Sequence, residues 1–200
     1  MFLKPDFTAL SCVSAVFGAV CSALALPGVV RPAAAARAWK AFPRSVWPGR
    51  AMAAVALAWA AAWAPTFLVE FMPSVAPSLF PYLQWALAAM VAATCWALPG
   101  LLSCRAAGML MVLVPTPMLS AAQWHPSPWR YLVIAVAYAM AVAGMFAIAR
   151  PWLLRDAVFA ANASETRTRA VSAAFLALGL SFLLCAALAF PVAPGAAPLR

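Results

Sequence analysis

Charge and polarity are scarce in this chain of 200 residues. Only 8% of the residues are charged and only four are acidic, whereas 68% are hydrophobic. Soluble domains are about a quarter charged and at most about half apolar. A chain with so few polar side chains cannot shield its apolar surface from water, so the composition excludes a soluble globule and a disordered chain. It predicts a protein with several membrane-spanning helices.

Residues that carry most enzyme chemistry are also few. The chain has one histidine, His125, and no H-E-x-x-H, G-x-S-x-G or phosphate-binding loop sequence. A single histidine excludes a bis-histidine haem within the chain, and the four acids leave no pair of carboxylates inside the membrane. We therefore predict no catalytic residue, no cofactor and no metal, and the sequence leans against an enzyme.

The cysteines do not form a recognisable site. No C-x-x-C pair or Cys/His cluster is present, and all five lie in or beside apolar runs. Free cysteine behaves as a small apolar residue, so we interpret them as packing residues. They are Cys12, Cys21, Cys95, Cys104 and Cys185.

Six apolar runs are candidates for membrane spans. A span needs about 20 apolar residues, because about 30 Å of hydrocarbon is crossed at about 1.5 Å per residue. Five runs reach this length, and one is shorter and interrupted by Pro115 and Pro117. The predicted spans are residues 7–30, 51–72, 82–104, 109–124, 131–149 and 170–190, and a short Pro-rich tail covers 191–200.

Lys and Arg set the predicted orientation, because they favour cytoplasmic loops. If all six runs span and the N-terminus is outside, most of the 13 basic residues fall in inner loops. The bias weakens if the interrupted run does not span. The sequence thus predicts an all-α bundle of three out–in–out hairpins in a bacterial inner membrane, with both termini outside. A cleaved signal peptide over residues 1–25 is the alternative interpretation of the first run.

Two basic segments are predicted to lie on the cytoplasmic side. In the first, basic residues recur at i, i+3 and i+7 and apolar or aromatic residues recur on another face, as in a helix at the headgroup level. Pro43 and Pro48 are predicted to break this helix. The residues predicted to contact anionic headgroups are Arg37, Lys40, Arg44 and Arg155.

The two basic segments also share a spacing. The interval from Arg31-Pro32 to Arg50-Ala51 equals the interval from Arg150-Pro151 to Arg169-Ala170. Ser45 and Ser164 hold equivalent positions between them. This pattern favours the hypothesis of a repeated helix–segment–helix unit, and chance similarity in an Ala- and Arg-rich chain is the alternative.

Polar residues of the spans supply the candidate ligand-binding residues, because such residues are costly in lipid. Four of them, Glu70, Gln84, Gln123 and His125, fall at the outer interface of the predicted topology. Pro115 and Pro117 are the others, because a helix broken in mid-span leaves carbonyl groups for a ligand.

These features predict a small, non-enzymatic membrane subunit or a lipid-interacting scaffold. Its expected partners are anionic lipid headgroups and another membrane protein. No nucleic acid is expected, because the basic residues lie between apolar runs. The first alternative is a carrier for a small apolar or weakly polar molecule that uses the Pro-broken fourth span. The second is a membrane enzyme that acts through Glu70 and His125 at the outer interface.

Overall fold

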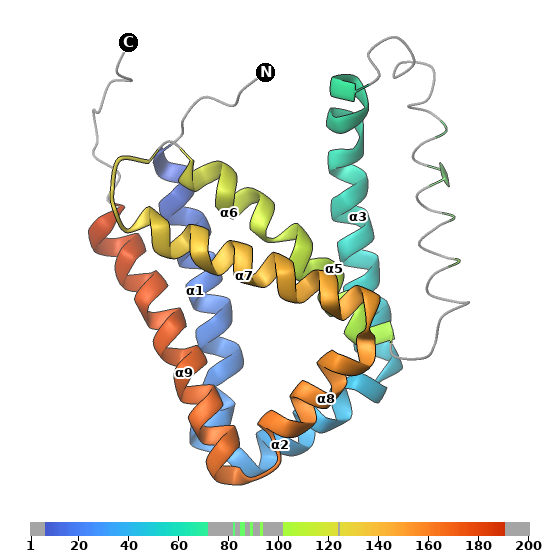
Figure 1. Cartoon of the computed structure of the whole chain (residues 1–200), viewed down its shortest axis with the longest axis vertical. Coiled ribbons are helices and arrows are strands. Elements are labelled where there is room, and N and C mark those ends of the chain that lie inside the picture. Colours follow the sequence, from blue (N-terminus) through green and yellow to red (C-terminus); the bar gives the residue numbers. More distant parts are fainter. Residues whose placement is uncertain are drawn as a thin grey trace. The chain divides into compact units, whose positions relative to one another are not determined.

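The computed structural model describes residues 7–71, 102–123 and 125–190, with a few isolated positions between 82 and 93. Side chains of the first range are described from residue 10 to residue 62. Every regular element in these residues is a helix, and none is a strand (Figure 1). The prediction of an all-α protein is therefore confirmed.

The first described range holds three helices and a 3-10 turn. They are α1 (Phe7–Val30), α2 (Pro32–Ala41), η1 (Phe42–Arg44) and α3 (Val46–Phe71). The remaining ranges hold five helices and a π-helical turn. They are α5 (Leu102–Leu113), α6 (Pro115–Ala122), α7 (Arg130–Ala149), α8 (Pro151–Ala161), α9 (Glu165–Leu184) and η2 (Cys185–Ala189).

Four stretches of helix among the described residues are long and apolar enough to cross a membrane. They are Leu10–Val30, Leu102–Ala122, Arg130–Ala149 and Glu165–Ala189. Large apolar side chains on these helices are exposed: Val16, Phe146 and Phe175 are 65%, 57% and 54% accessible. Exposed apolar surface of this extent is unfavourable in water, so the helices indicate a membrane protein.

The predicted boundary between the third and fourth spans is wrong. Residues 102–108 are helical, so the helix that contains the fourth span begins at Leu102 and not at Met109. Arg105 accordingly lies in the first turns of α5 and not in a loop. The rest of the predicted third span, 82–101, is outside the described residues apart from isolated positions. The predicted second span lies within α3 up to Phe71.

The two predicted basic segments fold as separate short helices, α2 and α8. Each begins at a proline, where the missing N–H costs nothing because a first-turn donor has no intrahelical partner. The first segment ends at η1, which contains Pro43, and Pro48 falls in the first turn of α3. The prediction that prolines break this segment is thus confirmed at Pro43.

The chain forms two compact units. Unit 1 comprises residues 1–38, 114–140 and 160–200, and unit 2 comprises residues 39–113 and 141–159. Helix α7 therefore contributes its first half to unit 1 and its second half to unit 2.

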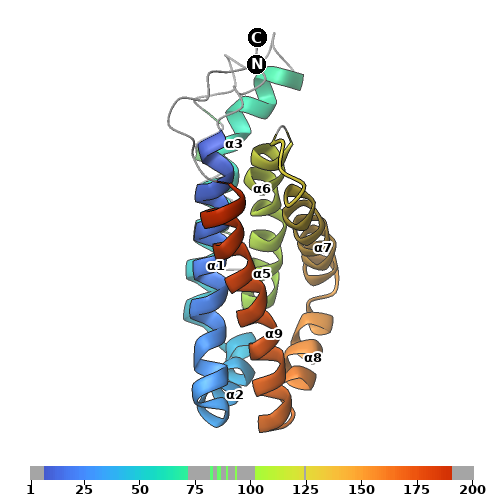
Figure 2. The same cartoon turned by 90° about the vertical axis from the view of Figure 1, so that its left-hand side faces the viewer.

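In unit 1, α1 and α9 run antiparallel and in close contact (Figure 2). Gly18 lies opposite Gly179, and a Cβ atom on Gly18 would be 2.7 Å from the Gly179 carbonyl oxygen. Ten residues further along α1, Gly28 lies against Ser172 of α9. Lipid gives apolar helices no hydrophobic reason to associate, so small residues that allow close backbone approach are the means by which these two helices pack.

The apolar core of unit 1 lies at the end where α1 and α7 begin and α6 and α9 end. Phe17 of α1 packs on Phe182 of α9, with ring centroids 4.8 Å apart. The fully or nearly fully buried members of this core are Leu10, Met118, Ala122, Val133, Ala137, Phe182, Cys185 and Phe190.

Unit 2 uses the same kind of contact twice. Gly108 of α5 faces Gly144 of α7, and a Cβ on either glycine would lie within 3.0 Å of the other's carbonyl oxygen. Gly49 of α3 faces Ser103 of α5, and Ala53 one turn later packs with Leu102 and Ala106. Helices α3 and α5 therefore begin side by side and run in the same direction.

The two Arg-Pro corners fold alike. Pro32 starts α2 and Pro151 starts α8. The number of residues between these two prolines is the same as the number between the ends of α1 and α7. It is also the same as the number between the starts of α3 and α9. Buried positions recur at the same interval, in the pairs Ser14 and Val133, Gly18 and Ala137, Ala25 and Gly144, and Gly28 and Ala147. The structure thus supports the repeated unit that the loop spacing suggests.

The substitution Gly18→Val tests the α1–α9 contact. Its side chain would meet the Gly179 backbone, so we expect unfolding in mixed detergent micelles to require about 1–3 kcal/mol less free energy. Ala19→Val is the matched control, because Ala19 is exposed on the same helix. Equal stability of the two variants would contradict this packing.

Candidate functional site

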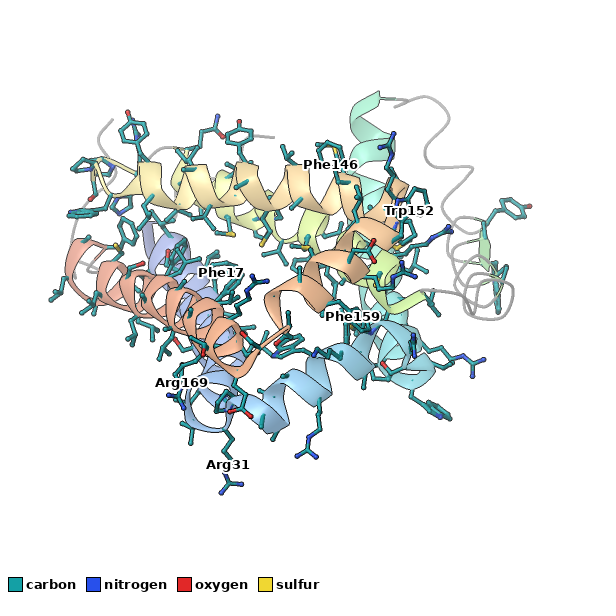
Figure 3. The ribbon with its side chains drawn as sticks, turned by 60° about the horizontal axis from the view of Figure 1, so that its bottom comes forward. Phe17, Arg31, Phe146, Trp152, Phe159 and Arg169 are labelled. Atoms are coloured by element: carbon teal, nitrogen blue, oxygen red, sulfur yellow. The ribbon has the colours of Figure 1, made fainter. Side chains whose placement is uncertain are left out.

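Basic side chains gather at one end of unit 1. Arg31 and Arg37 follow the end of α1, and Arg167 and Arg169 lie in the first turns of α9; all four are exposed. Figure 3 shows Arg31 and Arg169 at this shared end of the two helices. Arg130 is the one described basic residue at the opposite end of the unit. Unit 1 is therefore strongly asymmetric in charge.

Unit 2 has the same asymmetry. All its described basic residues lie where α3 and α5 begin and α7 ends: Lys40, Arg44, Arg50, Arg105, Arg150 and Arg155. The one described carboxylate there is Asp156, which Arg155 holds through Nε at 2.9 Å and Nη2 at 2.8 Å. Asp156 is exposed and the Arg155 side chain is partly exposed, so this ion pair between neighbours adds little stability.

The four residues predicted to contact headgroups all belong to these basic ends. Arg37 and Arg44 are exposed, and Lys40 and Arg155 are half-buried. Helix α2 turns Pro32, Ala35 and Ala36 inward, and this burial leaves the charged side outward. Just after it, the rings of Trp39 and Phe42 meet edge to face with centroids 6.2 Å apart. An apolar ring pair beside outward cations is the arrangement expected of a headgroup-level helix.

His125 lies in the loop between α6 and α7 and is 8% exposed. The backbone N–H of Ser127 donates to its Nδ1 at 3.2 Å, and Arg130 Nη1 donates to its carbonyl oxygen at 2.8 Å. Its ring meets the Phe190 ring edge to face, with centroids 4.8 Å apart. Burial, and secondly the charge of Arg130, lower the pKa of this imidazole. A neutral ring that accepts at Nδ1 connects the loop to Phe190, the residue that follows η2.

Of the other predicted outer residues, Gln123 is the one whose side chain the structure describes. Gln123 is exposed at the end of α6. Glu70 lies in α3, but its side chain, like all of Gln84, is outside the part of the chain that the structure describes. The Glu70–His125 arrangement on which an enzyme would depend thus remains a prediction.

Pro115 and Pro117 form a modest irregularity in the fourth span. Pro115 starts α6 and is buried, and Pro117 is half-buried. The preceding residue, Val114, keeps helical backbone angles, with φ −59° and ψ −37°. The two prolines lack the N–H donors that would otherwise bond to the Met111 and Leu113 carbonyls. Their role as ligand-binding residues stays a prediction.

The cysteines take different positions. Cys104 and Cys185 are buried, Cys21 is half-buried and Cys12 is exposed. The packing interpretation therefore fits the first two best. Within the described ranges, no three His, Cys, Asp or Glu side chains gather in a way that could hold a metal ion.

Arg105 is the functional candidate that sequence reasoning misses. The positive-inside argument counts it as one loop charge, whereas the structure places it in α5 with a buried Nε that has no hydrogen-bond partner. The sequence feature that could have identified Arg105 is its position three residues before Gly108. Residues three apart share a helix face, and Gly108 lies on the face of α5 that packs.

Comparison with protein-family models, curated proteins and solved structures finds no match to this chain.

The pKa of His125 predicts the pH dependence of stability. Folding lowers this pKa below the usual value of about 6.5, so the neutral form is favoured in the folded state. Stability should be full above about pH 6.5 and should decrease as the pH falls toward the folded pKa. We expect the thermal midpoint in detergent to be lower at pH 5 than at pH 7.5.

His125→Asn is the control for this effect. Its side-chain oxygen can still accept from the Ser127 N–H, but it does not titrate in this range. Its midpoint should therefore change less between the two pH values than that of the wild type. Identical pH profiles would show that His125 does not carry the dependence.

Proposed function

We propose that the chain is a non-enzymatic scaffold or subunit of a bacterial inner membrane that binds anionic lipid through its cytoplasmic face. The observation that carries this proposal is the crowding of exposed Lys and Arg at one end of each unit. Anionic lipid attracts such residues with about 1 kcal/mol for each cation near the surface. Another membrane protein is the second proposed partner.

Charge supports the orientation. Helices α1 and α7 end at the basic ends, and α3, α5 and α9 begin there. The positive-inside rule favours a cytoplasmic position for such ends. In this arrangement α1 and α7 cross inward and the other three helices cross outward, as the predicted topology requires.

The parallel start of α3 and α5 supports six spans. From Gly49 to Phe71, α3 rises by about 33 Å, which is the thickness of the hydrocarbon core. Helix α5 begins beside Gly49, so an α3 that crosses the membrane requires a returning span before Leu102. We propose that the apolar run 82–101 is this returning span. The three hairpins and the outside position of both termini follow from it.

Cysteine labelling tests this topology. In a background without native cysteines, Lys40→Cys and Glu165→Cys should react with a membrane-impermeant maleimide only in inverted membrane vesicles. Gln123→Cys, which replaces an exposed residue, should react only in right-side-out vesicles. Labelling of all three from the same side would contradict the proposed topology.

A lipid-dependence experiment tests the binding. We expect phosphatidylglycerol in phosphatidylcholine nanodiscs to raise the thermal midpoint of the wild type. Replacement of the four arginines of the unit 1 basic end by glutamine should remove part of this increase, because about 1 kcal/mol per cation is lost while the basic end of unit 2 stays intact. The four are Arg31, Arg37, Arg167 and Arg169.

The matched control replaces the same four arginines by lysine. This variant keeps the charge, so it should retain most of the increase. If phosphatidylglycerol does not affect the wild type, or if the glutamine variant responds as strongly as the wild type, the proposed function is wrong.

A further inference from the structure

The start of α5 is built into a polar corner of unit 2. The Ser103 hydroxyl donates a hydrogen bond to the Ser45 carbonyl, which directly precedes α3. A Cβ on Gly49 would lie 2.7 Å from Ser103 Oγ. The first turns of α3 and α5 are therefore held together before either helix enters its apolar part.

Two arginines flank this contact. Arg50 follows Gly49 directly and lies one turn before Ala53, and Arg105 lies directly before Ala106. Ala53 and Ala106 are both fully buried in the α3–α5 contact. Both arginines are half-buried, unlike the exposed arginines of unit 1. Two cations at the same level of one helix pair repel each other unless an anion lies between them.

Arg105 is left unsatisfied. Its Nε is buried and has no hydrogen-bond partner. An unmet donor on a charged group costs more than on a neutral one, and an arginine near hydrocarbon is kept only where it is paired. The position therefore calls for an acceptor that the described residues do not supply to this Nε.

Helix α8 adds a third cation. Arg155 of α8 lies at the same basic end of unit 2, because α7 packs on α5 through Gly144 and Gly108 and α8 follows the end of α7. The carboxylate that α8 contributes, Asp156, is already engaged by Arg155 at 2.8 Å. The corner thus carries three guanidinium groups and one carboxylate, and its net charge is positive.

We infer that Arg50, Arg105 and Arg155 form a discrete binding site for one phosphate group, that of an anionic phospholipid at the cytoplasmic interface. Guanidinium groups pair with phosphate oxygens in two-point hydrogen bonds. Basic pockets between membrane helices on this side hold such headgroups. The inference rests on the proposed topology, but it adds one saturable site to general charge attraction.

Short-chain lipid titration tests the site. The full chain in maltoside micelles is titrated with dioctanoyl phosphatidylglycerol, with dioctanoyl phosphatidylcholine and with inorganic phosphate, and bound molecules are counted by native mass spectrometry. We expect one phosphatidylglycerol to bind, and Arg105→Gln to weaken it about tenfold. Arg130→Gln is the control, because Arg130 is a basic residue at the end of unit 1 opposite to the basic end; it should bind as the wild type does.

The probes separate the sources of the phosphate. If inorganic phosphate competes for the single site, the site binds a free anion and the inference of a lipid ligand is wrong. If phosphatidylcholine binds as tightly as phosphatidylglycerol, the site does not recognise the negative charge of the headgroup and the inference is wrong. The inference is also overturned if the wild type shows no saturable binding, or if Arg105→Gln with normal helical circular dichroism binds like the wild type. Should Arg105→Gln fail to fold, Arg50→Gln provides the same test.

A further variant separates this inference from the proposed function. Glutamine in place of the four unit 1 arginines leaves unit 2 intact, so the single tight phosphatidylglycerol should remain. Its loss in that variant would show that only general charge attraction operates. Its persistence without any effect of anionic lipid on stability would support the site and contradict the scaffold proposal.

Discussion

Lipid as the solvent is the constraint on which this structure depends. In water, large apolar side chains fill a core and small or polar residues cover it; here Val16, Phe146 and Phe175 are exposed. The closest backbone approaches between helices are made by small residues, as at Gly18 with Gly179 and Gly108 with Gly144. In hydrocarbon, burying a large apolar side chain yields no hydrophobic gain, so the closeness of the backbones decides which helices pack.

The same constraint concentrates charge at the helix ends. Arginine cannot remain within the hydrocarbon layer without a partner, so both units place their basic residues where helices start or stop. The same arrangement occurs at both Arg-Pro corners, the segments that follow Arg31 and Arg150. At each corner a long helix ends, a proline starts a short helix, and a serine precedes the next long helix. Arg105 is the exception that lies inside a helix contact, and its unmet Nε is the feature that suggests a specific ligand.

Composition and periodicity predict the helical class, the first of the two short basic helices and three of the long helices almost to their ends, because these depend on local residue type. They fail at the start of α5, where the tertiary contact between Gly49 and Ser103 extends the helix through Arg105. The small-residue contacts were also beyond prediction, since alanine and glycine occur on every face of these helices. His125 was predicted as a polar interface residue, but only the fold shows that Phe190 covers its ring.

Depth measurement by spin labelling shows whether the long helices lie in lipid. Nitroxides at Val16→Cys and Phe175→Cys, in a chain without native cysteines and reconstituted in bilayers, should collide readily with oxygen and rarely with a water-soluble nickel chelate. A nitroxide at Arg167→Cys should show the reverse. If the chelate reached positions 16 and 175 as readily as position 167, these helices would not lie in lipid and the account would be contradicted.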